Sequence, residues 1–182
     1  PGILGRDVSG QEISVPEPED LIFEAGPGAR MDQDGCKIYA EVDGQPSLNA
    51  LGKVSVLSEL EITGDVDFKS GNIDFQGNLI VKGSIKEGFK VKAASLTCKQ
   101  VEGGQIELSG DLNCSAGIIN AKLVKVNGTI QAKYVNNSIV DSFGDMIIQN
   151  EIIDSIIQLS GRLINSRGSI LSSQICAKGG IE

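Results

Sequence analysis

The amino-acid sequence predicts an all-β fold: a single-stranded parallel β-helix (β-solenoid) with about 17 residues per coil, preceded by a small β-hairpin element. Two observations predict the helix: a short phrase recurs at nearly constant spacing, and apolar residues alternate with polar ones around each copy. Composition agrees, because 23 of the 182 residues are Gly and none is Trp. Glycine-rich corners between runs of β-branched residues favour strands and turns over long helices.

The recurring phrase is a small residue, a polar residue and an apolar residue. In residues 106–132 it occurs at 110–112 (GDL) and again at 128–130 (GTI). Its small residue, the anchor, recurs every 16 to 18 residues from Gly77 to Gly179, a period typical of repeat architectures. The anchors are Gly64, Gly77, Ala94, Gly110, Gly128, Gly144, Gly161 and Gly179. We interpret them as corners, where glycine adopts positive φ at no steric cost.

Three apolar columns follow from the repeat, because equivalent residues of stacked coils lie above one another. Two residues after the anchors come Val66, Leu79, Leu96, Leu112, Ile130, Met146, Leu163 and Ile181. Mid-repeat come Ile85, Val101, Ile118, Val135, Ile152 and Ile170. Four and two residues before an anchor come Leu60/Ile62, Ile73/Phe75, Ile106/Leu108, Val124/Val126, Ile157/Leu159 and Ile175/Ala177, with Phe89/Val91 and Val140/Phe143 displaced by a residue. Three short strands per coil predict a β-solenoid, since helical solenoids need repeats of about 33 residues or more.

The repeat divides the chain into two parts. Residues 58–182 form the β-helix of about seven coils, truncated at its C-terminal end, and at about 4.8 Å per coil they make a rod on the order of 35 Å long. Residues 1–57 do not follow the period. They contain turn signals at 34–35 and 43–44 (both DG) around an alternating run, after an extended proline-containing linker at 16–20. We expect this part to cap the solenoid, because an open coil end exposes unpaired strand edges.

Charge is unevenly distributed along the chain. Residues 1–67 carry a net charge of −10 and residues 68–182 a net charge of +2. A pI near 4.6 argues against nucleic acid as a partner. Lys82, Lys99 and Lys133 share one outward position, which we interpret as a solvated lysine face; an anion or membrane patch is the alternative, and nothing else in the sequence supports membrane contact.

Residue types that carry chemistry are few. The absence of histidine removes the commonest general base, Ser-His and Cys-His nucleophiles and most zinc sites. Cys98 and Cys114 lie four residues after an anchor and are expected to stack inside the coils, as core cysteines rather than a redox pair. Their predicted column also contains Phe68, Val81, Ala132 and Ile148. Asn165 falls in the same column, as a hydrogen-bonded Asn or through a local register shift.

Candidate carboxylates do not indicate an enzyme. Asp65, Asp111 and Asp145 are predicted to share an outward corner position, but other residue types interrupt them and aromatic sugar platforms are scarce. Calcium-binding nonapeptides are absent, and hexapeptide acyltransferases have a period of six residues and depend on histidine. The sequence therefore assigns no catalytic, metal-binding or cofactor-binding residue, and predicts a non-enzymatic protein.

Four stretches resemble the bacterial flagellar assembly protein A family: PGILGRDVSG (1–10), DGCKIYAEVDG (34–44), the segment from GKVSVLSELEITGDVDF to FKVKA (52–93), and IELSGDLNCSAGI (106–118). The resemblance implies a right-handed β-helix between an N-terminal domain and a helical tail, so that this chain would be the central part of a longer protein. It implies a part in flagellar assembly or polar placement, and it transfers no catalytic residue.

Taken together, the residues and the resemblance predict a cytoplasmic structural or interaction module, at the cell pole or the inner membrane surface. It would be a rigid rod that binds or positions partner proteins. The alternative is a self-assembling scaffold similar to bactofilin filaments or to the β-helical half of the division-site protein MinC. Coil ends and the outward apolar residues Ile80, Ile147 and Ile164 motivate that alternative.

Overall fold

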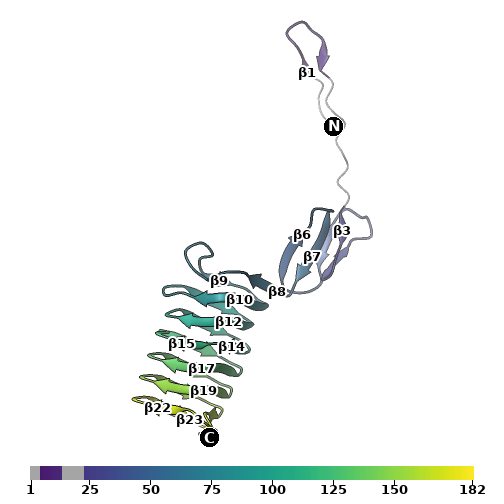
Figure 1. The fold of residues 1–182 in the computed structure, drawn as a ribbon. Helices are drawn as coiled ribbons and strands as arrows, with labels where there is room; N and C mark the ends of the chain where they lie inside the picture. Colours follow the sequence, from purple (N-terminus) through teal and green to yellow (C-terminus); the bar gives the residue numbers. More distant parts are fainter. Residues whose placement is uncertain (1–4, 14–22) are drawn as a thin grey trace.

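The structure is a computed structural model that describes residues 5–13 and 23–182. A small N-terminal β module leads into a stack of flat coils (Figure 1). The N-terminal strands are β1 (Gly5–Arg6), β2 (Glu12–Ile13), β3 (Glu24–Ala25), β4 (Ala29–Met31), β5 (Ile38–Ala40), β6 (Gln45–Leu48) and β7 (Lys53–Leu57). Within the described ranges, no helix has the length and hydropathy needed to cross a membrane.

The N-terminal strands form three antiparallel hairpins, β1–β2, β4–β5 and β6–β7, and β3 pairs with β7 in parallel. β4 pairs with β5 around a turn in which Gly35 has φ +67°, as the DG signal at 34–35 predicts. β6 pairs with β7 around a second turn, where Gly52 has φ +80°. The predicted linker at 16–20 lies outside the described residues. Among the described strands, none from this module pairs with the first coil, so capping of the solenoid stays a prediction.

The coils have three flat faces, each a parallel sheet. Face A consists of β8 (Glu59–Ile62), β14 (Leu112–Cys114), β21 (Leu163–Ile164) and the first halves of the bent strands β10 (Asn78–Ile85), β12 (Ser95–Glu102), β17 (Ile130–Asn136) and β19 (Met146–Ile153). Face B consists of their second halves with β15 (Gly117–Ile119) and β22 (Ser169–Leu171). Face C consists of β9 (Ile73–Asp74), β11 (Lys90–Ala93), β13 (Gln105–Leu108), β16 (Leu123–Val126), β18 (Ile139–Ser142), β20 (Ile156–Leu159) and β23 (Gln174–Ala177). The predicted solenoid of about seven coils is confirmed; its right-handedness stays a prediction.

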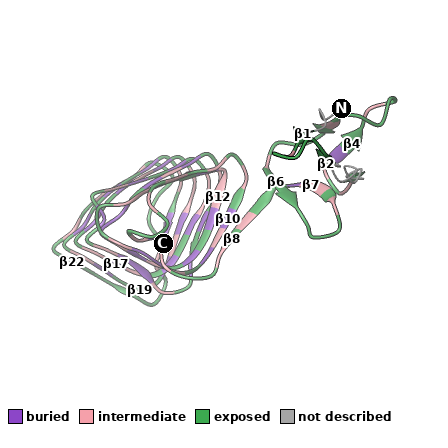
Figure 2. Ribbon diagram, turned by 90° about the horizontal axis from the view of Figure 1, so that it is seen from above, coloured by how far each residue is buried: buried purple, intermediate pink, exposed green. Residues whose placement is uncertain are grey.

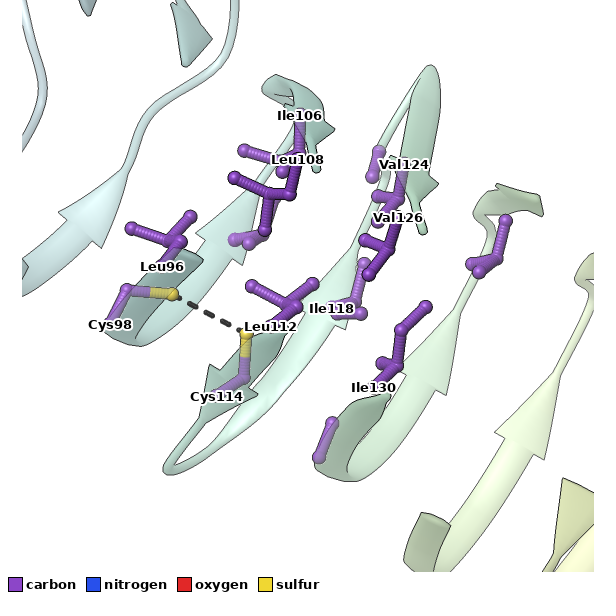
Figure 3. Close-up of a cluster of buried hydrophobic side chains, with 14 of the residues drawn as sticks. Leu96, Cys98, Ile106, Leu108, Leu112, Cys114, Ile118, Val124, Val126 and Ile130 are labelled. Carbon is purple, nitrogen blue, oxygen red and sulfur yellow. Dashed lines mark hydrogen bonds between the residues drawn. The ribbon is translucent and has the colours of Figure 1, made fainter. Parts of the chain in front are cut away.

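Each face contributes one or two buried columns to a continuous core, and the buried residues line the inside of the superimposed coils (Figure 2). The register on face A is Leu79, Leu96, Leu112, Ile130, Met146 and Leu163, as the repeat predicts. The mid-repeat column from Ile85 to Ile170 is confirmed on face B. Side chains of three neighbouring coils meet in the interior (Figure 3), where each buried Leu or Ile contributes about 1.5–3 kcal/mol.

The first coil departs from the predicted register. Leu60, rather than Val66, lies beside Leu79, and Val66 instead pairs with Ile85 on face B. The predicted equivalence of Leu60/Ile62 with the column before the anchors is therefore wrong. The phrase at Gly64 marks the corner between faces A and B, where Gly83 donates its N–H to the Gly64 carbonyl, and not the start of a coil. The first coil also contains a surface loop at residues 67–71.

Face C differs from the prediction in two coils. Val91 and Ala93 pair with Ile106 and Leu108, so the coil before Ala94 is displaced by one residue as predicted, but its inward pair includes Ala93 and not Phe89. In the coil before Gly144, the two inward positions are held by Val140 and Ser142, so the predicted role of Phe143 is wrong. The buried Ser142 hydroxyl donates to the carbonyl oxygen of Gly128 (3.0 Å), which satisfies a polar side chain in an otherwise apolar column.

Space, not positive φ, explains the anchor glycines. The positive-φ glycines of the described chain do not include Gly110, Gly128, Gly144 or Gly161. Instead, a Cβ built on Gly161 would lie 2.5 Å from Asp145 Oδ1, and one on Gly110 would lie 2.8 Å from Ser95 Oγ. At Gly110, Gly128 and Gly161, the polar residue after the preceding anchor folds its side chain over the glycine, which leaves no room for a Cβ; at Gly144 the backbone of Gly128 takes up this space.

A serine ladder forms the corner between faces B and C. The hydroxyl of Ser138 donates to the carbonyl of Asn136 (2.7 Å) and accepts the backbone N–H of Ala121 from the preceding coil (3.1 Å). Ser155 makes the two equivalent contacts one coil later, and the backbone N–H that it accepts is that of Ser138, at 3.2 Å. Residues just before these corner positions have positive φ: Gly103, Asn120, Asn137, Asp154 and Ser172. Buried backbone donors at this corner are thus paired by side chains.

Candidate interaction surfaces

The three candidate carboxylates do not form a cluster. Asp111 and Asp145 share a face A column, but Asp65 belongs to the long first coil and lies at the corner next to Ser84, so its predicted place in that column is wrong. Each accepts a backbone N–H of the next coil at 2.7 Å: Asp65 from Ser84, Asp111 from Thr129, and Asp145 from Arg162. These hydrogen bonds are the main reason why the pKa values of Asp65 and Asp145 lie below the ordinary value of 3.8.

Cys98 and Cys114 stack inside adjacent coils, as the sequence predicts, with their sulfur atoms 3.4 Å apart (Figure 3). Their hydrogen bond and burial hold the pKa of Cys114 well above its ordinary value of 9.0. Phe68 does not lie in this column, because it belongs to the first-coil loop. Asn165 keeps the predicted register, next to Ile148, and neither polar atom of its amide has a hydrogen-bond partner among the described residues.

Among the described residues, three lysines of the solenoid, Lys82, Lys86 and Lys90, form ion pairs with acids of neighbouring coils. Lys82 lies 3.4 Å from Glu61, and Lys90 lies 2.9 Å from Glu107. On face C the outward column runs Asp74, Lys92, Glu107, Lys125 and Asp141, with alternating charge. Lys82, Lys99 and Lys133 do share an outward position, interrupted by Ser115. The alternating charges on face C are consistent with a solvated face more than with an anion patch.

An aliphatic ladder lies on the outside of face C. Leu123, Ile139 and Ile156 occupy one outward column of three consecutive coils, and other coils fill it with Lys90, Gln105 and Gln174. Ile139 and Ile156 are 44% and 45% exposed. Across the serine corner, an outward column of face B runs Ile119, Asn136, Ile153 and Leu171, so that an asparagine interrupts its apolar side chains. The contiguous apolar surface of the ladder on face C is typical of protein-binding faces.

Face A carries a different outer surface. A polar groove of about 540 Å³ crosses its first coils, lined by amide and hydroxyl groups that include Asn78, Thr97 and Gln131. The predicted outward residues Ile80, Ile147 and Ile164 are half-buried within the same column, the last two on adjacent coils. Face A therefore turns from polar to partly apolar along the rod.

The first-coil loop presents an aromatic side chain. Phe68 is 95% exposed and packs edge-on against Phe89, with ring centroids 5.2 Å apart. A hollow of about 400 Å³ lies beside the two rings, lined also by Asp67, Lys86, Glu87 and Glu102. Lys86 contacts Glu102 at 2.7 Å and Asp65 at 3.6 Å. The repeat alone does not predict this site, because it places Phe68 in the core.

A rod of stacked coils with an ordered interior and distinct outer faces defines the chain as a β-solenoid protein. It belongs to the Flagellar Assembly Protein A family. Residues 58–182 match the Flagellar Assembly Protein A beta solenoid domain, and residues 1–50 match the Flagellar Assembly Protein A N-terminal region. No curated protein and no solved structure matches the chain.

Proposed function

We propose that this chain is a non-enzymatic scaffold of flagellar assembly: a rigid β-helical rod that binds and positions partner proteins. The family supports the flagellar context. We place the protein in the cytoplasm, at the cell pole or the inner membrane surface, because paired free thiols such as Cys98 and Cys114 suit a reducing compartment.

The observation that carries the proposal is the aliphatic ladder. Leu123, Ile139 and Ile156 face outward on consecutive coils of a sheet whose inner face already fills the core. Their exposure contributes nothing to folding, whereas burial under a partner would gain about 25 cal/mol for each Å² of apolar surface. Because the sheet beneath is continuous, the side chains of the ladder are already ordered. The scaffold therefore loses little conformational entropy when a partner binds.

The carboxylates support a structural role rather than a catalytic one. Asp65, Asp111 and Asp145 each tie one coil to the next through a backbone N–H, so their charge serves the stacking of coils. The depressed pKa values of Asp65 and Asp145 follow from the same contacts. A polysaccharide-cleaving site would instead need two carboxyl groups facing one substrate, about 5–10 Å apart.

Deletion of the gene in its host, followed by electron microscopy of flagella, tests the flagellar role. The sharper variant is Ile139→Lys with Ile156→Lys in the chromosomal copy, which introduces charge into the ladder while both side chains stay solvated. Flagella are expected to be lost or misplaced, at unchanged protein level by immunoblot. Gln158→Lys on the same face is the matched control. Normal flagella in both the deletion and the ladder variant would reject the proposal.

A self-assembling scaffold is the second candidate, favoured by one observation. Among the described strands, β8 pairs only with β10, so one of its edges is open to another strand. Stacking of a second copy on this edge would continue the parallel sheet. Sedimentation velocity at rising concentration tests it: growing oligomers support filament formation, and a constant monomer excludes it for this chain.

A further inference from the structure

The hollow beside Phe68 combines an aromatic wall with excess negative charge. The rings of Phe68 and Phe89 pack edge to face, at 88°, although Phe68 is almost fully exposed. The loop beneath it is ordered by its own hydrogen bonds, since Asp67 accepts the N–H of Lys69 (2.8 Å) and donates its own N–H to Ser70 (3.0 Å). A preordered, exposed aromatic ring is a typical anchor of a protein interface.

The charges of the hollow select the occupant. Three carboxylates line it, those of Asp67, Glu87 and Glu102, against the single ammonium group of Lys86. Lys86 is already paired with Glu102 and Asp65, whereas Glu87 has no ion pair among the described residues. A cation that enters the hollow therefore meets an aromatic face and an unpaired carboxylate together.

We propose that this hollow binds a basic segment of a partner protein, through an arginine side chain laid over Phe68 and paired with Glu87. Arginine fits better than lysine, because its planar guanidinium stacks on aromatic rings and bonds a carboxylate with two N–H groups. The net charge of −10 over residues 1–67 would draw such a segment to this end of the rod and would repel an anionic membrane. The inference rests on the proposed function only in that the occupant is a protein.

Fluorine NMR on the full chain tests the hollow directly. The chain has five phenylalanines, so labelling with 4-fluorophenylalanine gives five resonances, assigned by single Phe→Leu variants. The probe is the peptide acetyl-Arg-Leu-Arg-amide, with the neutral isostere acetyl-citrulline-Leu-citrulline-amide as its control. Saturable shifts of Phe68 and Phe89 are expected with the arginine peptide alone. Phe143, 68% exposed on another face, is the internal control and should not move.

Two variants identify the contacts. Phe68→Leu keeps an apolar, exposed side chain and removes the ring, so affinity measured at the Phe89 resonance should fall about fivefold. Glu87→Gln should weaken binding about threefold, and Glu151→Gln, which removes an exposed carboxylate on β19, should not. Equal binding of the citrulline peptide, or unchanged affinity in Phe68→Leu, would overturn the proposal. Flagellar defects of the ladder variants would stand in either case, so the two proposals fail independently.

Discussion

The carboxylate of Asp111 accepts the backbone N–H of Thr129, one coil further along the rod, at 2.7 Å. The contact lies directly over Gly128, where the Asp111 carboxylate occupies the space that a Cβ would need. At Gly128 and Gly161, the aspartate after one anchor therefore excludes a side chain at the next anchor. At these positions each copy of the phrase makes room for the side chain of the copy before it, whereas Ala94, the anchor that follows Asn78, carries a Cβ.

Gly128→Ala tests this steric rule. A methyl group there meets both Asp111 and the backbone of Gly110, so we expect a loss of about 1–3 kcal/mol in the free energy of unfolding. Gly64→Ala is the matched control, because a Cβ on Gly64 meets nothing within 4 Å. Urea unfolding followed by circular dichroism measures both. Equal losses would show that backbone entropy, rather than space, determines the anchors.

The inward and outward register is tested by neighbouring substitutions. Leu112→Asp buries an unpaired charge in the core and should cost at least about 4 kcal/mol. Asp111→Ala removes the outward carboxylate that accepts the Thr129 N–H and should cost about 1 kcal/mol. Chemical denaturation of the two variants gives the comparison. A milder effect for Leu112→Asp than for Asp111→Ala would contradict the register.

The serine ladder should be as important as an apolar column. Ser138→Ala removes the acceptor of the buried Ala121 N–H and the donor to Asn136, so the free energy of unfolding should fall by about 1–3 kcal/mol. Ser160→Ala, on an exposed hydroxyl of face C, should have little effect. Thermal unfolding of both proteins measures the difference. A Ser138→Ala variant as stable as Ser160→Ala would mean that water replaces the hydroxyl.

Stability should decrease in acid through the coil-bridging carboxylates. Because the folded-state pKa values of Asp65 and Asp145 lie below 3.8, the folded protein holds fewer protons than the unfolded chain near that pH. Their stabilisation is complete above pH 3.8 and is lost as the pH falls through the folded-state values. Unfolding midpoints across pH 2 to 6 check this. In Asp65→Asn/Asp145→Asn the acid-dependent slope should be smaller, and an unchanged slope would assign it to other groups.

Thiol accessibility should divide the four cysteines into two pairs. Cys36 and Cys176 are exposed, whereas Cys98 and Cys114 are buried and the pKa of Cys114 is raised, which slows thiolate formation. We expect two thiols to react with Ellman's reagent in the native protein and four in denaturant. Cys36→Ser/Cys176→Ser should then be unreactive until it unfolds; rapid reaction of that variant would place the core pair at the surface.

The repeat predicted the architecture well, because each coil is locally similar and stacks on its neighbours. It failed at Leu60 and Val66, because the phrase at Gly64 lies at the corner between faces A and B and not at the start of a coil. The same misplaced anchor concealed Phe68, since a register error of a few residues moves a side chain from core to solvent. The recurrence of Ser138 and Ser155, each after a polar residue, is visible in the sequence. Their hydrogen bonds between neighbouring coils are visible only in three dimensions.

Variation in coil length is absorbed at corners and loops, and the sheets keep one residue above another. Consecutive coils are consequently spaced at a constant distance of about 4.8 Å along the rod. Phe68 marks the first coil, and the ladder of Leu123, Ile139 and Ile156 begins three coils later. Inserting one whole coil between them would move these two surfaces apart by about 4.8 Å, and deleting one would bring them closer by the same distance. The spacing between the Phe68 surface and the ladder can thus change in steps of one coil, while each surface keeps its own geometry.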